Sequence, residues 1–277
     1  MELNDEQIER YSRHIILEQI GAAGQEKRLS SKMLIIGAGG LGAPAGLYLA
    51  AAGVGAIGIA DMDRVDLTNL QRQVIHHTTD IGKEKVQSAA DKMRAINPDV
   101  NVITHRMFVN AANIRGLIRP YDFVIDGTDN FAAKFLINDA CFFESKPFSH
   151  AGILRFQGQI ITVVPGSTCF RCIFDAPPPP GTIPSCSQAG VLGALAGVLG
   201  SLQATEAIKY VLGIGQLLTN AVLTYDALTM QFRKIDIARN PRCRLCGKEP
   251  EIDELTDEPL PACDLRGRKT HERAANG

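Results

Sequence analysis

The chain has 277 residues, of which 45% are hydrophobic and 21% charged, and its formal charge at pH 7 is −1. These values predict a globular protein with a sizeable core, and they give no overall charge that would attract nucleic acid or an anionic membrane, so we expect neither as a partner. The seven cysteines are an odd number, and the charged N-terminus lacks an apolar core. We therefore expect a chain without a signal peptide, in a reducing cytoplasm, rather than a disulfide framework.

Short apolar segments alternate with helical ones in the first half of the chain. Residues 5–18 are predicted to form a helix, capped by Asn4 or Asp5, that ends at the glycines of 21–24. Strands are then expected at 32–36, 56–60, 100–104 and 121–125, and helices at 41–52, 83–96, 111–118 and 131–143. Because strands that alternate with helices form parallel sheets, the predicted fold class is α/β, Rossmann-like, with helices on both faces of a mostly parallel sheet.

Glycine and proline interrupt the second half of the chain, after residue 149. Apolar segments at 159–164, 221–225 and 231–237 predict strands that extend the sheet in an antiparallel manner. The segment 189–204 is mostly apolar, and its glycines are spaced three or four residues apart. It is shorter than the roughly 20 apolar residues that a membrane helix needs. We therefore expect a helix buried in the core or at a subunit interface.

A glycine-rich turn follows the first strand and leads into a helix, which is the context that a dinucleotide-type GxGxxG motif requires. A helix N-terminus offers free N–H groups and positive potential to a phosphate. Asp61 ends the next strand, where a carboxylate can accept hydrogen bonds from ribose hydroxyls. The alternative is a turn that needs glycine for packing alone, and the motif does not distinguish NAD from ATP. The glycines of the motif are Gly37, Gly39, Gly40 and Gly42.

Two basic residues favour a triphosphate. Residues 68–73 follow Asp61 and Asp63 closely, and Lys85 begins the next helix. A triphosphate needs more positive charge than a dinucleotide does, and Arg72 and Lys85 can supply it, the arginine through two parallel hydrogen bonds. Taken singly, each of these cations is also compatible with a solvated surface charge.

Asp129 lies after the fourth strand, at the carboxyl edge where parallel sheets bind their ligands. A carboxylate there can hold Mg²⁺ together with phosphates, because Mg²⁺ prefers one or two carboxylates. The alternative is an acid that stabilises the dipole of the helix that follows, with Asn130 as its N-cap.

Four of the cysteines form two CxxC pairs, which favours a structural Zn²⁺ site with four thiolates. The pairs are much further apart than the roughly 15–20 residues of a zinc ribbon, so they would meet only through the fold. A redox role is the alternative for either pair alone. The cysteines of the pairs are Cys169, Cys172, Cys243 and Cys246. Cys186 stands apart in a polar loop before the 189–204 helix, and either a nucleophile or an ordinary loop cysteine fits that position.

The chain resembles the HesA/MoeB/ThiF family of sulfur-carrier-protein adenylyltransferases, relatives of the ubiquitin-activating enzymes, from about residue 5 to 247. The resemblance rests on Tyr11-Ser12-Arg13, the glycine turn, Asp61-Met62-Asp63, Asn69-Leu70-Gln71-Arg72-Gln73, Lys85, Thr128-Asp129-Asn130, the two CxxC pairs and Tyr225-Asp226.

This resemblance implies that ATP binds on the glycine turn, against Gly40 and Asp61. Asn69, Arg72 and Lys85 would hold its phosphates, and Asp129 would hold Mg²⁺. The complete expected nucleotide-binding set is Gly37, Gly39, Gly40, Gly42, Asp61, Asp63, Thr68, Asn69, Leu70, Gln71, Arg72, Lys85, Asp129 and Asn130.

The resemblance also implies a homodimer in which Arg13 reaches into the partner's site, and a structural zinc ion on the four paired cysteines. Cys186 matches a loop cysteine that some members use to form a thioester or acyl-disulfide with the carrier.

The substrate that the resemblance implies would be a ubiquitin-like carrier that ends in Gly-Gly, either the small subunit of molybdopterin synthase or a thiazole-type carrier. The carrier would be adenylylated with release of pyrophosphate and thereby prepared for thiocarboxylation. Because no rhodanese-like domain follows residue 247, we expect a separate sulfur donor such as a cysteine desulfurase or a rhodanese.

One domain is therefore expected over residues 1–247, with a nucleotide-binding half at about 30–150 and a carrier- and zinc-binding half at about 151–247. A charged tail at 248–277 is expected to be disordered. Two other functions fit parts of the sequence. An NAD-dependent oxidoreductase fits the glycine turn and Asp61, but no hydride-transfer site is evident. A non-catalytic module held together by zinc is also possible in this superfamily, although Arg72, Lys85 and Asp129 argue against it.

Overall fold

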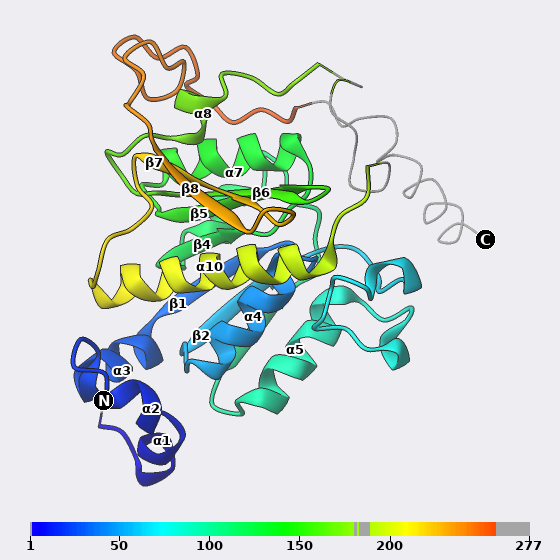
Figure 1. Cartoon of the computed structure of the whole chain (residues 1–277), viewed down its shortest axis with the longest axis vertical. Coiled ribbons are helices and arrows are strands. Elements are labelled where there is room, and N and C mark those ends of the chain that lie inside the picture. Colours follow the sequence, from blue (N-terminus) through cyan, green and yellow to red (C-terminus); the bar gives the residue numbers. More distant parts are fainter. Residues whose placement is uncertain (1, 180–181, 183–188, 259–277) are drawn as a thin grey trace.

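The computed structural model describes residues 2–179, 182 and 189–258. Eight strands form one sheet in the order β3-β2-β1-β4-β5-β6-β7-β8 (Figure 1). Strands β1 to β5 run parallel, and β6, β7 and β8 extend the sheet in antiparallel pairs. The predicted α/β class with an antiparallel C-terminal extension is thus confirmed. The strands are β1 Lys32–Ile36, β2 Ala56–Ala60, β3 Asn101–His105, β4 Phe123–Asp126, β5 Phe148–Leu154, β6 Gln157–Val163, β7 Ala221–Asp226 and β8 Gln231–Asp236.

Alternating residues of the central strands bury opposite faces of the sheet. Met33 and Ile35 of β1 pack with residues of α4, α5 and α10, whereas Leu34 and Ile36 pack with residues of α6 and α7. Helices therefore cover both faces, which explains why β1 is apolar almost throughout. The helices are α1 Asp5–Arg10, α2 Ser12–Ile15, α3 Gly21–Ser30, α4 Gly42–Ala51, α5 Lys85–Ile96, α6 Ile114–Ile118, α7 Phe131–Phe143, α8 Phe170–Ile173 and α10 Gly193–Leu212.

The N-terminal segment differs from the single helix expected over 5–18. The helix breaks at Tyr11, whose side chain is buried and whose hydroxyl accepts a hydrogen bond from Asn97 Nδ2 at 2.8 Å. Gly21 was expected to end this helix, but it begins α3, because its φ of 60° allows the sharp turn that precedes the new helix. Tertiary anchoring of one aromatic side chain thus overrides the helical pattern.

The long helix expected over 189–204 is displaced to residues 193–212, and Figure 1 shows it crossing α4. Gly200 permits this crossing, because a Cβ there would lie 2.3 Å from the carbonyl oxygen of Leu41. None of the helices among the described residues combines the length and apolarity that crossing a bilayer requires. Leu195, Ala196 and Leu199 of this helix are buried, which supports its interpretation as a helix packed in the core.

One strand was not predicted, and part of the expected tail has contacts. Strand β5 links the parallel and antiparallel parts of the sheet, pairing with β4 on one side and β6 on the other. Beyond residue 248, Ile252 and Leu255 pack against the core, and Asp257 Oδ1 accepts a hydrogen bond from the N–H of Ala111. Residues 259–277, the rest of the expected tail, lie outside the described residues.

Candidate functional site

The glycine turn lies between β1 and α4, and backbone packing explains two of its four glycines. A Cβ at Gly42 would lie 1.9 Å from the carbonyl oxygen of Gly37. Gly37 has φ 99°, and a Cβ there would lie 2.7 Å from the carbonyl oxygen of Gly127, in the loop after β4. At Gly39 the nearest atom would be 3.7 Å away, an ordinary contact. Packing within the chain therefore leaves Gly39 unexplained, which is the pattern expected where a ligand approaches the backbone.

The turn also presents free donors. The N–H groups of Gly39 and Gly40 have no hydrogen-bond partner within the described part of the chain. Both precede the first turn of α4, where the helix dipole adds positive potential. The turn can therefore bind an anion such as a phosphate.

Asp61 closes the turn from the end of β2. Its carboxylate accepts hydrogen bonds from the N–H groups of Ala38 and Asp63, each at 2.8 Å. Burial raises the pKa of Asp61, against the opposing effect of the Lys85 ammonium. Asp61 thus links the glycine turn to the segment that carries the predicted cations.

Lys85 is 6% exposed at the start of α5, and its Nζ donates to Asp63 Oδ2 at 2.9 Å. Burial lowers the pKa of Lys85, but the carboxylates of Asp61, Asp63 and Asp129 outweigh this effect, so that its pKa is raised. The lysine is therefore a buried, charged cation. Because lysine is rarely buried without a partner, the burial of Lys85 argues against the alternative of a solvated surface charge.

Arg72 lies directly over the turn. Its Cγ is 3.5 Å from the position that a Cβ of Gly40 would occupy, and its Nη1 donates to the carbonyl oxygen of Thr68 at 3.1 Å. Thr68 and Asn69 belong to a short 3-10 helix, η1 Leu67–Asn69, that a capping box at Asp66 stabilises. The backbone of Gln71 packs against the first residue of α10, because a Cβ on Gly193 would lie 2.2 Å from its carbonyl oxygen. The fold thus places the 68–73 segment beside the glycine turn, as the sequence analysis expected.

Asp129 is exposed in the loop between β4 and α7, and Asn130 Oδ1 accepts from the N–H of Ala133 at 2.8 Å, as expected of an N-cap. The carboxylate of Asp129 contributes to the raised pKa of Lys85. Asp129 and Lys85 therefore interact electrostatically, and the exposed carboxylate of Asp129 is open to a metal ion.

The four cysteines of the CxxC pairs meet in space. Their sulfur atoms all lie within 4.8 Å of one another, and Sγ of Cys169 is 3.8, 3.6 and 3.4 Å from those of Cys172, Cys243 and Cys246. Four thiolates around one zinc ion, with Zn–S bonds of about 2.3 Å, would lie about 3.8 Å apart. Gly247 permits the tight turn after the second pair, because a Cβ there would lie 2.4 Å from the carbonyl oxygen of Cys243. The donor set and its geometry therefore fit a closed tetrahedral metal site.

Two other predicted residues stand apart from this site. Cys186 lies outside the described residues. Arg13 is exposed on α2, which Figure 1 shows near the start of β1, whereas the glycine turn follows the end of that strand. Arg13 is therefore not part of the turn's surroundings within its own chain.

Several polar residues at this site are buried, and the sequence did not reveal their burial, even for Gln73, which belongs to a quoted motif. Gln73 is 4% exposed beside Gly39, and its Oε1 has no hydrogen-bond partner among the described residues. Nε2 of His76 lies 3.0 Å from the carbonyl oxygen of Ala38 in the glycine turn. Beneath the loop after β4, the fully buried Asp126 accepts hydrogen bonds from Thr128, Lys134 and His150. An isolated polar residue in a sequence does not show that it is buried, so only the fold identifies this group.

The Asp126 group makes the stability of the protein depend on pH. Burial and the nearby Lys134 ammonium lower the pKa of His150 to about 4, against the opposing carboxylate of Asp126. Because an unfolded histidine titrates near pH 6.5, only the unfolded chain gains this proton between about pH 6.5 and 4, and stability should fall across that range. We expect His150→Asn, whose amide can replace Nδ1–H as donor to Asp126, to remove up to about 3 kcal/mol of this pH dependence. Chemical denaturation at a series of pH values measures the free energy of unfolding. If this free energy depends on pH in the same way for the wild type and for His150→Asn, His150 is not the source of the pH dependence.

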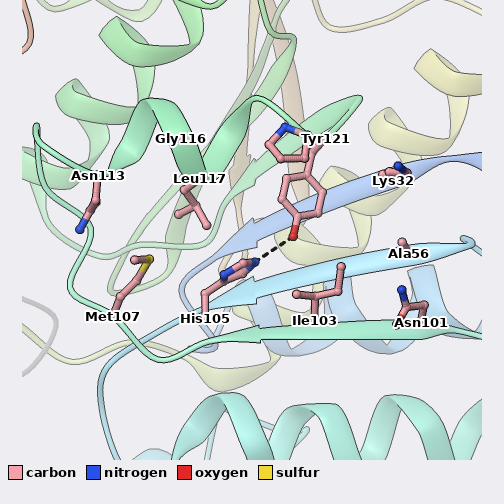
Figure 2. Close-up of a pocket in the computed structure, with 11 residues that line it drawn as sticks. Lys32, Ala56, Asn101, Ile103, His105, Met107, Asn113, Gly116, Leu117 and Tyr121 are labelled. Atoms are coloured by element: carbon pink, nitrogen blue, oxygen red, sulfur yellow. Dashed lines mark hydrogen bonds between the residues drawn. The ribbon is translucent and has the colours of Figure 1, made fainter.

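A cavity of about 520 Å³ lies elsewhere, beside the edge strand β3 (Figure 2). Figure 2 shows His105 and Tyr121 joined by a hydrogen bond of 2.9 Å at this cavity. Ile103, Met107 and Leu117 supply apolar lining. None of the predicted site residues lines it, so it is separate from the glycine turn.

The fold and the glycine turn, with its acidic and basic residues, define a Rossmann-like nucleotide-binding protein. The ThiF family model matches residues 11–245, and the chain belongs to the ThiF family. It is 44% identical over 263 residues to the sulfur carrier protein adenylyltransferase of Thermus thermophilus, an alignment that covers 93% of this chain and 97% of that protein. It is 45% identical over 257 residues to the SAMP-activating enzyme E1 of Haloferax volcanii, with 93% and 95% covered.

A solved structure shares the fold. The crystal structure of Escherichia coli MccB with ATP superposes with a TM-score of 0.76 at 24% identity, covering 86% of this chain and 74% of that one. At this identity the likeness concerns the fold alone.

Proposed function

We propose that this chain is a nucleotidyltransferase that uses ATP to adenylylate the C-terminal glycine of a ubiquitin-like sulfur-carrier protein. The observation that carries the proposal is the placement of Arg72 and the buried Lys85 around the glycine turn and Asp61. Free N–H groups with two nearby cations suit a triphosphate better than the single pyrophosphate of a dinucleotide. The names of two relatives, an adenylyltransferase and an activating enzyme, point the same way.

In the proposed reaction, a carboxylate oxygen of the carrier attacks the α-phosphorus of ATP, and the bond to the pyrophosphate oxygen breaks. The products are an acyl-adenylate and pyrophosphate, which prepares the carrier for thiocarboxylation. The glycine turn and Asp61 hold the nucleotide, and Arg72 and Lys85 stabilise the negative charge that develops on the phosphates. Mg²⁺ held by Asp129 would neutralise part of the same charge. The carrier would be the small subunit of molybdopterin synthase or a thiazole-type carrier.

The cysteine cluster would hold a structural zinc ion. Four thiolates leave no open coordination position, so the ion would stabilise the junction between α8 and the chain after β8 rather than act on substrate. Cys186 would serve as a nucleophile toward the activated carrier. Sulfur would come from a separate donor, a cysteine desulfurase or a rhodanese.

We further propose a homodimer in which Arg13 of one protomer enters the partner's nucleotide site. Ile16 and Leu17 are 70% and 47% exposed next to Arg13, which suits a surface covered by a second copy. The domain would span residues 1–247, in the cytoplasm. The five described cysteines are free of disulfides, which fits a reducing compartment.

The hairpin of β7 and β8 would bind the carrier. Strand β8 is an edge strand of the sheet. Met230, in the turn before it, and Phe232, on it, are 70% and 50% exposed, and the ring of Phe232 stacks on that of Tyr225 with the ring centroids 4.2 Å apart. We expect Phe232→Asp to raise the KM for the carrier about tenfold or more, because it removes an exposed aromatic anchor. The KM for ATP should stay unchanged, and kinetics with each substrate varied in turn measures both. A rise in both constants would place the carrier elsewhere.

Exchange of labelled pyrophosphate into ATP tests the activity itself. Exchange should require a carrier that ends in Gly-Gly and should stop when its last glycine is deleted. Exchange that proceeds without any carrier would contradict a carrier adenylyltransferase, and binding of NADH in place of ATP would support an oxidoreductase.

A further inference from the structure

Ala38, in the glycine turn, is held through both of its backbone polar groups. Its N–H donates to Asp61 Oδ2 at 2.8 Å, and its carbonyl oxygen lies 3.0 Å from Nε2 of His76. Ala38 is fully buried and His76 is 4% exposed. The bond to His76 is therefore shielded from water, and neither Ala38 nor His76 is explained by the nucleotide contacts proposed above.

The bond to His76 determines where the next N–H group points. The carbonyl of Ala38 and the N–H of Gly39 belong to one planar trans peptide, so they point in opposite directions. With the carbonyl directed at His76, the N–H of Gly39 is directed away from it, and that N–H has no partner within the described part of the chain. His76 thus orients a free donor of the turn.

The hydrogen-bond partners also determine the proton on His76. A carbonyl oxygen can only accept, so Nε2 must carry a hydrogen. Nδ1 lies 2.9 Å from Oγ of Ser88, which in turn lies 3.0 Å from Oδ2 of Asp80. In the neutral ring Ser88 donates to Nδ1. In the charged ring Nδ1–H donates to Ser88, which then donates to Asp80. Both arrangements keep the hydrogen on Nε2.

Asp80 anchors this chain of hydrogen bonds. It is 1% exposed, it accepts from Lys83 Nζ at 2.8 Å and from the N–H of His77 at 2.9 Å, and it pairs with Lys92. Its carboxylate is thus well satisfied before Ser88 is considered, and burial of His76, which lowers the pKa of that ring, favours the neutral form.

We propose that His76 is a positioning residue for nucleotide binding: its Nε2–H holds the carbonyl of Ala38 so that the N–H of Gly39 faces the phosphates, while the contact of Nδ1 with Ser88 holds the ring in place. The inference rests on the proposed ATP site and adds a residue that does not itself touch the nucleotide.

Two near-isosteric variants test it. The amide nitrogen of His76→Gln can reach the place of Nε2 and donate to Ala38, whereas that of His76→Asn reaches only the place of Nδ1. We expect His76→Asn to raise the Kd for ATP about tenfold, the effect of one lost hydrogen bond, and His76→Gln to recover most of that loss. His105→Gln, at the separate cavity of Figure 2, is the control and should bind ATP as the wild type does. Calorimetric titration of each full-length protein with ATP measures the constants.

A purely structural role for His76 would change the fraction of active protein and the melting temperature but leave Kd unchanged. Equal Kd values for the wild type and His76→Asn would therefore overturn the inference while leaving the proposed function intact. Failure of the wild type to bind ATP would overturn the proposed function itself. In protein labelled with ¹⁵N-histidine, the His76 signal should show a hydrogen on Nε2, and a ring with its hydrogen on Nδ1 alone would also contradict the inference.

Discussion

Arg72→Ala should reduce carrier-dependent pyrophosphate exchange by about 10²–10³-fold in kcat/KM, the usual cost of removing a donor that stabilises transition-state charge. The arginine lies over Gly40 and has few contacts of its own, one of them to the carbonyl oxygen of Thr68. Its loss should therefore affect catalysis much more than folding. Arg72→Lys should recover only part of the activity, because an ammonium cannot make two parallel hydrogen bonds.

Arg64 offers a matched control on the same segment. Its Nη1 donates to the carbonyl oxygen of Gly82, its Nη2 lies 3.9 Å from Oε1 of Glu84, and it makes no contact with the glycine turn among the described residues. Arg64→Ala should leave exchange within about twofold of the wild type, because it changes only a surface contact. If the Arg64 and Arg72 variants lose activity equally, the effect is one of net charge, and the placement of Arg72 at the phosphates is wrong.

Cys246→Ser should remove the metal ion and destabilise the protein strongly. A structural zinc ion binds with an apparent free energy of about 10–16 kcal/mol in small peptides, and part of that contributes to folding. A loss of even several kcal/mol should lower the melting temperature by about 10 °C or more. Metal analysis and calorimetry of the purified protein measure the two effects.

Cys141 provides the control for the cluster, since it is a buried cysteine outside it. Cys141→Ala should keep one metal ion per chain and should cost only what a small cavity costs, about 1–2 kcal/mol. Wild-type protein that contains no metal, or a Cys246→Ser variant that keeps its full content, would show that the four thiols serve another purpose.

The parts of the fold that the sequence predicted are those with a local pattern. Strand β1 is buried on both faces and therefore consists of consecutive apolar residues, which is recognisable without knowledge of its neighbours. The glycine turn is recognisable for the same reason, since Gly37 and Gly42 are required by contacts within a few residues or by a φ that only glycine adopts easily. Arg72 and Lys85 could be proposed because they belong to a motif with a fixed order along the chain.

The parts that were missed depend on distant contacts. Strand β5 contains the polar residues Ser149 and His150, which are buried only because Gln203 of α10 and Asp126 of β4 bond to them or their neighbours. His76 likewise owes its position to Ala38 and Ser88, which lie 38 and 12 residues from it in sequence. No periodicity predicts such pairs, because each bond joins residues on different elements.

The contact between Gly37 and Gly127 joins loops that follow two neighbouring strands, β1 and β4. Because the two backbones touch without intervening side chains, we expect that neither loop can shift alone and that the floor of the proposed nucleotide site is rigid before any ligand arrives. Little backbone ordering is then left for binding, which favours fast association and a small entropic penalty. Any larger residue at either position would separate the loops, so these two glycines can change during evolution only together with the surrounding backbone.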